Sequence, residues 1–449
     1  MAQQQTLAPE QEAPATPASR SARRTLRWAA AASLTLLALL TLAALHFVRG
    51  VERDLDALEV RLLAQAAALR DEAAAERAPL LGPAQEGNAA LHYRSLTYAW
   101  GAEGTPESAL PLARRQRREL GARTISPDLL ADLRAHLEGG EELYPEALRV
   151  FRERLPLLDH LSAGVRQTRC DWEPDPFELD DYRALPMDTL QEVALIASCA
   201  AFREDDPRRA LERGLELVLF AQDLARFPDM LYAGEALEIE QVGLRSLERT
   251  LGQRQHARAD LEWTRSVLTQ LPAWDLSWHR RGDRLAERAS LLWATGRLSG
   301  TSLGPSKHLR DLGRQPHRIL LWRELEGVER FAPQGDRLFG LPPWERDAAS
   351  AALGVEIADS GYSLAQLESA PGWALTHVDR SRTLRAGISG LIQAHLVRLE
   401  QGEFPYDLDL PPDPFDPQGA PLGYARDHEH VWIRTCKAGG PLELRSSAR

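Results

Sequence analysis

The sequence has little cysteine and no recognisable catalytic motif. Its 449 residues include only three cysteines, Cys170, Cys199 and Cys436, which are too few and too scattered for a metal-binding cysteine framework. Two interpretations of them stay open: a disulfide between Cys170 and Cys199 in an oxidising compartment, or three separate buried thiols. A Gly-rich phosphate loop, a Gly-x-Ser-x-Gly elbow and a His-Glu-x-x-His helix are all absent. The sequence therefore predicts no catalytic, cofactor-binding or metal-binding residues, and no cofactor.

The chain also lacks an excess of positive charge. Its net charge is −11, so it carries no electrostatic footprint for nucleic acid. Hydrophobic residues make up 44% of the sequence and charged residues 27%, which is the balance of a folded globular protein. The composition thus excludes a mostly disordered chain and gives no reason to expect a nucleic-acid partner.

Long hydrophobic runs are rare, and only one is long enough to cross a bilayer. Residues 28–48, WAAAASLTLLALLTLAALHFV, are uncharged and meet the requirement of roughly 20 apolar residues. Arginines crowd the N-terminal side of this run, which predicts that residues 1–27 form a disordered cytoplasmic tail. The run is longer than a typical signal-peptide core and lacks a convincing cleavage site. We therefore predict a single-pass signal-anchor of the inner membrane, with the bulk of the chain in the periplasm.

The membrane helix is expected to continue beyond the bilayer as a stalk over residues 49–79. A stripe recurs at spacings of three and four, which is a short heptad pattern: Val51, Leu55, Leu58, Leu62, Gln65 or Ala66, and Leu69. Two interpretations of this stripe stay open. The stalk forms a homodimer through it, or the stripe packs on the soluble domain of the same chain.

Residues 90–375 read as one helical domain. Ser126 is a predicted N-cap before Pro127, and Asp205 or Asp206 is predicted to cap a helix that opens at Pro207. An Asp-Pro turn between two helices resembles a tetratricopeptide hairpin, but a repeat of fixed period is absent. The fold class is therefore mainly α, with an irregular helical bundle or solenoid, and the part from Ala332 to Trp373 is expected to be looser.

Residues 376–449 change character toward the end. A long helix is predicted from about Val378 to Glu400, followed by a Pro- and Asp-rich segment. Two short strand-like runs, 421–425 and 430–435, flank a polar turn, so a small C-terminal β-hairpin is expected.

This end of the chain carries a recognisable pattern of residues. A long helix is followed by a Gly-x-Phe-Pro turn, an Asp-Pro-Phe segment and a Pro-Leu-x-Tyr strand, built from Gly402, Phe404, Pro405, Asp413, Pro414, Phe415, Pro421, Leu422 and Tyr424. The pattern resembles the globular end of the major pseudopilins of type II secretion. The N-terminus has neither the prepilin-peptidase site nor the early Glu of that family, and its calcium site is not carried over. As a whole, the chain is similar to uncharacterised bacterial envelope proteins with an N-terminal anchor, a helical region and this short end.

Three groups of side chains have the residue types of a site. His428 and His430, within Asp427–His430, would share one face of a strand and could hold zinc or nickel; a solvated turn is the alternative. His279 and Asp283, four apart on a helix, could be a general base with its orienting carboxylate; a surface pair is the alternative. Oxygen ligands for calcium are offered by Asp407, Asp409, Asp413 and Asp416.

The prediction that follows is a membrane-anchored, non-catalytic scaffold or protein-interaction module with other envelope proteins as partners. Tryptophans such as Trp263, Trp274 and Trp278 are interpreted as core residues or as anchors that face a partner. Two other functions stay open: a membrane-tethered hydrolase of the cell envelope, and an accessory component of a secretion or pilus-like system.

Overall fold

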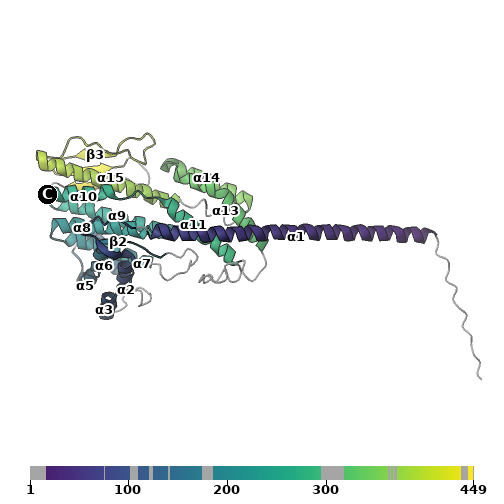
Figure 1. The fold of residues 1–449 in the computed structure, drawn as a ribbon. Coiled ribbons are helices and arrows are strands. Elements are labelled where there is room, and N and C mark those ends of the chain that lie inside the picture. The colour runs from purple at the N-terminus through teal and green to yellow at the C-terminus, as the bar shows by residue number, and fades with distance from the viewer. Residues whose placement is uncertain are drawn as a thin grey trace, which may run out of the picture. The chain divides into compact units, whose positions relative to one another are not determined.

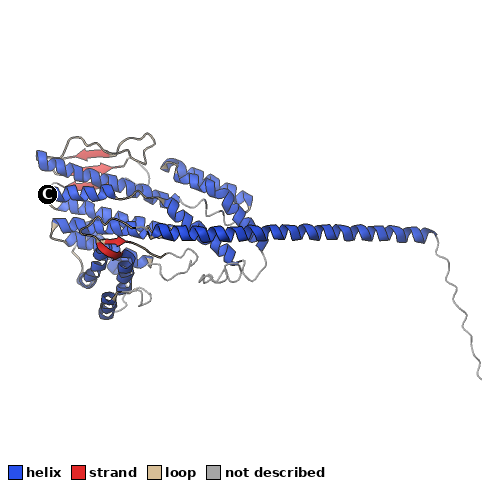
Figure 2. Cartoon of the chain, viewed as in Figure 1, coloured by secondary structure: helices blue, strands red, loops and turns tan. Residues whose placement is uncertain are grey.

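The computed structural model shows a mainly helical chain (Figures 1 and 2), as the sequence predicts. It describes residues 17–74, 76–101, 110–120, 125–139, 142–173, 186–294, 318–362, 365, 368, 372–435 and 443–447. The chain divides into two compact units, Met1–Leu58 and Glu59–Arg449. One helix, α1 (Pro17–Ala73), contains the end of the first unit and the start of the second.

The described part of the first unit is helical throughout. Helix α1 begins at Pro17, so the predicted tail is too long by at least the residues from 17 to 27, and residues 1–16 lie outside the described part. Proline suits the first position of a helix, and the Arg and Ala residues that follow are good helix formers. The hydroxyls of Thr35 and Thr41 donate to the carbonyls of Ala31 (2.9 Å) and Leu37 (2.8 Å), so these polar groups are satisfied within the helix. This helix is long and apolar enough to span a membrane.

The predicted stalk ends earlier than expected and is not free. Helix α1 ends at Ala73, and Leu62, Ala66 and Leu69 are buried, with exposed fractions of 4% or less. Glu72 also forms an ion pair with Arg281 of α11 (Leu276–Ala294), at 2.9 Å. In the part of α1 that belongs to the second unit, the stripe therefore packs on the domain of its own chain, which is the second of the two interpretations.

The second unit contains most of the helices. Their bounds are α2 Ala89–Trp100, α3 Pro111–Leu120, α4 Pro127–Gly139, α5 Pro145–Arg154, the 3-10 turn Leu155–Leu157, α6 Leu158–Gly164, α7 Met187–Arg203, α8 Pro207–Leu224, α9 Met230–Gln253, α10 Arg258–Gln270, α11 Leu276–Ala294, α13 Arg318–Phe339, α14 Pro343–Ser360 and α15 Gly372–Gln401. The predicted caps are confirmed, because Asp206 accepts the N–H of Arg208 (2.9 Å) and Ser126 that of Leu129 (3.4 Å).

Helices α7, α8 and α9 form the centre of the main core. The predicted α8–α9 hairpin is present, and the two helices cross closely where two glycines meet. A Cβ atom on Gly243 would lie 3.0 Å from the carbonyl oxygen of Gly214, so the absence of side chains sets this approach. Most buried apolar residues of these helices belong to one cluster that also contains Phe404 and Leu444 from the C-terminal part.

The C-terminal part is a sheet packed on α15. Strands β3 (Gly423–Arg426), β4 (His430–Arg434) and β5 (Glu443–Ser447) form one antiparallel sheet in the order β3-β4-β5 (Figure 2). The predicted hairpin is thus the first part of a three-stranded sheet. The predicted boundary at 376 does not separate two cores, because α15 and β5 both pack against α9. The outer edge of β5 is covered by α9 side chains: Arg245 donates to the carbonyl of Glu443 (2.9 Å), as edge strands require protection.

Helices α13 and α14 occupy most of the region, Ala332 to Trp373, that the sequence predicts to be loose. Helix α14 starts with a proline and ends before Gly361, which has the left-handed conformation (φ 72°) typical of a helix end. Its alanines give strong helix propensity but weak hydrophobic periodicity, which explains why the pattern is missed. Leu353 and Ile357 of α14 are buried with Phe331 and Leu338 of α13.

Candidate functional site

The turn between β3 and β4 uses its polar residues for its own structure. The carboxylate of Asp427 accepts the N–H groups of Glu429 (2.7 Å) and His430 (2.6 Å), and it lies 3.4 Å from the His430 ring. His428 is exposed. These contacts are those of a polar turn, the alternative given for this segment.

The acidic residues before the sheet also hold backbone groups. Asp413 is 1% exposed and accepts the N–H of Phe415 (2.9 Å), while Asp416 accepts the N–H groups of Gln418 (3.0 Å) and Ala420 (2.8 Å). Among the residues that the structure describes, no three His, Cys, Asp or Glu side chains are grouped so that they could hold a metal ion. The calcium hypothesis for this segment has no support in the geometry.

His279 and Asp283 are separate in function, and the interpretation of them as a surface pair is wrong for His279. His279 is 2% exposed and its Nε2 lies 2.7 Å from the carbonyl of Ala225, and burial lowers its pKa to about 4. Asp283 instead accepts the N–H of Met230 (3.2 Å). The ring faces a carbonyl and the carboxylate faces a helix N-terminus, so neither orients the other for catalysis.

Two of the cysteines are free, buried thiols. Cys170 donates to the carbonyl of Asp223 and Cys199 to that of Leu133, both at 3.8 Å. Burial raises the pKa of Cys170 well above its ordinary value and that of Cys199 to about 12, so neither is a ready nucleophile. The proposed disulfide between them is not formed, and Cys436 lies outside the described residues.

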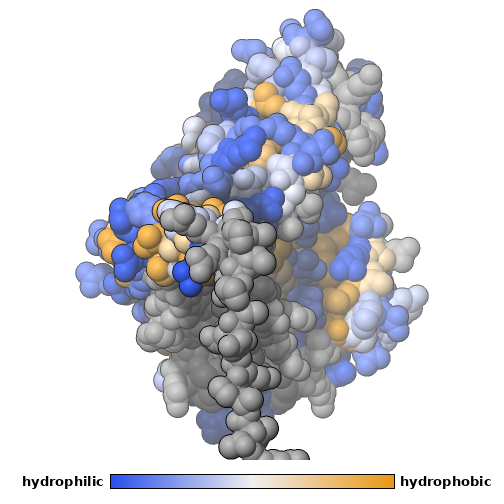
Figure 3. Space-filling model, turned by 90° about the vertical axis from the view of Figure 1, so that its right-hand side faces the viewer, coloured by the Kyte–Doolittle hydropathy of each residue, from blue (hydrophilic) through white to orange (hydrophobic). Residues whose placement is uncertain are grey.

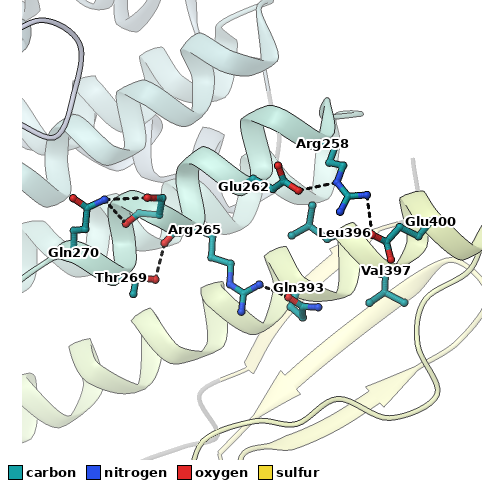
Figure 4. A pocket seen from close by; sticks show the side chains of 10 residues that line it. Arg258, Glu262, Arg265, Thr269, Gln270, Gln393, Leu396, Val397 and Glu400 are labelled. Atoms are coloured by element: carbon teal, nitrogen blue, oxygen red, sulfur yellow. Dashed lines mark hydrogen bonds and ion pairs between the residues drawn. The ribbon is translucent and has the colours of Figure 1, made fainter.

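A groove lies between α10 and α15 (Figure 4). It has a volume of about 480 Å³ and polar walls, and Leu396 and Val397 lie on its α15 side. Its charges are mostly satisfied, because Arg258 bridges Glu262 (2.7 Å) and Glu400 (2.8 Å). With an arginine held between two carboxylates, this groove presents a neutral polar surface.

A second hollow lies beside α6 and α8, with a volume of about 350 Å³. Glu216 in its wall is 2% exposed and pairs with Arg213 (2.9 Å) and Arg166 (3.5 Å). Arg166 also pairs with Glu212 (2.5 Å). These alternating charges neutralise one another, so the hollow is a structural ion-pair network open to solvent.

Buried ionic clusters between distant segments are the main feature that sequence reasoning misses. Glu240 of α9 is fully buried and accepts hydrogen bonds from Trp274, from Ser381 (2.6 Å) and from Arg385. Each of these donors lies between 34 and 145 residues away along the chain. Periodicity marks the apolar faces of helices, but it gives no signal for a carboxylate that will meet its partners only after folding. Of the tryptophans singled out, Trp274 therefore has a polar role at the edge of the core.

A further cluster surrounds α11. Arg284 contacts Glu368 (2.7 Å) and Asp336 of α13 (2.8 Å), and Arg280 donates to the same Glu368, which is 3% exposed on its side chain. Burial, and then the negative charge of Glu368, raise the pKa of Glu287 to about 7, while Arg288, Arg280 and Arg284 oppose this. Glu287 is thus a carboxylate that takes up a proton near neutral pH.

This pKa makes the stability of the fold depend on pH. Because the folded pKa of Glu287 lies above the ordinary value of about 4.3, its contribution to stability is present at acidic pH and is lost as the pH rises through 7. Glu287→Gln imitates the protonated form at every pH. The wild type loses stability between pH 5 and pH 8 as Glu287 ionises, and the variant does not. We therefore expect the free energy of unfolding of the variant minus that of the wild type to rise by about 2 kcal/mol from pH 5 to pH 8.

The measurement is chemical unfolding at the two pH values. Glu326→Gln on an exposed position of α13 is the control and should show no such change. An equal response of the two variants to pH would contradict the prediction.

Comparison with known proteins identifies no family for this chain. No family model, no curated protein and no solved structure matches it.

Proposed function

We propose that the chain is a membrane-anchored, non-catalytic protein whose helical domain binds other proteins of the cell envelope. The single observation that carries the proposal is α1. Its apolar stretch is exposed, with Leu34, Leu37 and Leu40 each about 60% exposed or more, and a lipid bilayer is the environment that such a surface fits. The helix then continues into the folded second unit without interruption.

The charge distribution supports an orientation for the anchor. Arg20, Arg23, Arg24 and Arg27 precede the apolar stretch, whereas Arg49 and Arg53 on the other side are mixed with acidic residues. An excess of positive charge favours the cytoplasmic side. The second unit then lies outside the cytoplasm, in the periplasm of a Gram-negative cell.

The anchor is tested by fractionation of native membranes. We expect the full-length chain, with its N-terminal residues still present in mass spectrometry of the purified protein, to stay in the membrane after alkaline carbonate extraction. Protease added to spheroplasts should digest the second unit. A chain that begins after residue 48 would show a cleaved signal sequence instead, and protection from protease would show the opposite orientation.

The scaffold is tested separately by photo-crosslinking in intact cells. A crosslinking amino acid placed at exposed positions of the second unit, such as Leu231 (62% exposed) and Tyr144 (70% exposed), should capture the same partner proteins reproducibly. Position 63 of α1 tests for a homodimer, because Leu63 is 46% exposed although the adjacent Leu62 is buried. Failure of all positions to capture a protein would contradict the scaffold proposal.

One observation favours a second candidate, an accessory role in a secretion system. A long helix, α15, packs on an antiparallel sheet, and the loop between them is fixed by the pattern that resembles pseudopilins. Phe404 is 2% exposed, and the Tyr424 hydroxyl donates to the carbonyl of Pro405 (2.7 Å). Loss of protein secretion on deletion of the gene, restored by the full chain, is the result that would support this role.

A further inference from the structure

Helix α14 presents an uncovered hydrophobic stripe on its outer side. Trp344 is 45% exposed and Val355 is 62% exposed, and Ala348 and Ala351 between them are exposed too. The spacing of four, three and four residues places all of them along one side of the helix. Small hydrophobic patches between hydrophilic residues are visible on the side of the molecule drawn in Figure 3. A large aromatic side chain at a solvent-exposed position is typical of an interface anchor.

The opposite side of α14 packs against the rest of the domain, so the stripe must face outward. Leu353 and Ile357 are 5% and 0% exposed and pack in the cluster with α13. Arg346 is 8% exposed, pairs with the buried Asp379 of α15 and donates to the carbonyl of Leu341 (2.7 Å). Hydrophobic packing and a buried ion pair thus hold the helix so that the stripe remains outside the core.

Exposed charges on both sides of the stripe are all negative. Glu345, Asp347, Glu356 and Asp359 are exposed, and none of them forms an ion pair with a residue in the described part of the chain. Arg346, the only basic residue of α14, is buried. A second copy of α14 would bring carboxylates against carboxylates, which is unfavourable. Charge complementarity therefore selects a basic partner over a homodimer.

We propose that this side of α14 binds a basic amphipathic helix of another protein. Apolar residues of that helix would pack on Trp344 and Val355, and its lysines or arginines would face the carboxylates that flank the stripe. This inference rests on the proposed scaffold function: a basic amphipathic helix is the class of partner that the α14 surface of the scaffold would bind.

Binding is tested with the full chain in a neutral detergent, because charged lipid would itself attract a basic peptide. The probe is a designed peptide as long as α14 (18 residues), with leucine on one side of the helix and lysine on the other. Its comparisons are a peptide of the same composition without the amphipathic order, and one with glutamate in place of lysine. Fluorescence anisotropy of the labelled peptides gives the dissociation constants.

We expect only the ordered basic peptide to bind the wild type. Trp344→Ala should weaken this binding at least about tenfold, since it removes the anchor. Replacing the four exposed carboxylates Glu345, Asp347, Glu356 and Asp359 by lysine should abolish it and should create binding of the acidic peptide. The matched control changes four exposed acidic residues on other elements to lysine, namely Glu119, Asp128, Asp205 and Glu429, and should leave the binding unchanged.

Equal binding of the ordered basic peptide by the α14 variant and by the control variant would overturn the inference. The same holds if the peptide without the amphipathic order binds the wild type as tightly as the ordered one. Circular dichroism verifies that the variants are folded. The proposed scaffold function has a different failure, the absence of any crosslinked partner in cells. If partner proteins are crosslinked in cells but the ordered basic peptide does not bind the wild type, the scaffold proposal stands and this inference falls.

Discussion

Arg77→Ala is expected to lower the free energy of unfolding by about 3–5 kcal/mol, because it leaves a carboxylate buried without its counter-charge. The Nη1 atom of Arg77 lies 2.7 Å from Oδ1 of Asp223, whose side chain is 2% exposed. The hydroxyl of Tyr93 donates to the other oxygen of the same carboxylate (2.5 Å). Arg77 also donates to the carbonyl of Gly164 (2.7 Å), and that contact would be lost as well.

A matched control for this prediction is another arginine with an ion pair of the same length. Arg149 pairs with Glu153 at 2.7 Å on the surface, with side chains 49% and 38% exposed, so Arg149→Ala should cost no more than about 0.5 kcal/mol. Denaturant unfolding followed by tryptophan fluorescence compares the two. Equal losses would contradict the prediction.

The double variant Arg77→Met with Asp223→Asn separates charge burial from packing. It removes both charges, and the asparagine can still accept the hydrogen bond of Tyr93. Its loss of stability should be smaller than that of Arg77→Ala, since a buried ion pair mainly compensates its own desolvation.

Gly282→Ala is expected to cost at least about 3 kcal/mol, at the upper end of what overpacking does. A Cβ atom at this position of α11 would lie 1.9 Å from the carbonyl oxygen of Pro228, which belongs to the backbone just before α9. Backbone cannot rotate away as a side chain can, so α11 or the turn before α9 must shift. In an open helix the same substitution would be stabilising by up to about 1 kcal/mol.

A glycine in an open part of a helix provides the control. Gly50 lies in α1, and a Cβ atom there would have nothing within 4 Å, so Gly50→Ala should leave the thermal midpoint of the folded domain unchanged or slightly higher. A midpoint of Gly282→Ala that stays at the wild-type value would show that α11 does not pack as closely on the turn at Pro228 as described.

The amino-acid sequence predicts those parts of the fold whose causes are local. Ser126 and Asp206 cap the helices that they were expected to cap, since an N-cap acts on backbone groups only two or three residues away. The long apolar run and the hairpin around Asp427 follow in the same way from neighbouring residues. Helix α14 is missed because alanine supports a helix without marking its buried side.

Contacts between distant segments are beyond such reasoning. Nothing near Glu240 in the sequence indicates that Ser381 and Arg385 will reach it. The pair formed by Arg77 and Asp223 likewise joins the segment after α1 to helix α8. The parallel pairing of β1 (Gln85–Asn88) with β2 (Gln167–Arg169) is another example, because its register links residues about 80 positions apart. The acidic side of α14 has a similar origin, since its exposure depends on how α13 and α15 cover the other side.

The position of β5 sets an order in which the domain can be completed during synthesis. Helices α8 and α9 are neighbours along the chain and can pair as soon as both exist, since local contacts form early. The edge of β5, however, is held by Arg245, and its partner Glu443 lies 198 residues further along. Until those residues emerge, Leu444 is missing from the core beside Gly387, and α9 keeps an uncovered side. The nascent chain thus passes through a stage in which that side of α9 is uncovered, and β5 covers it only at the end.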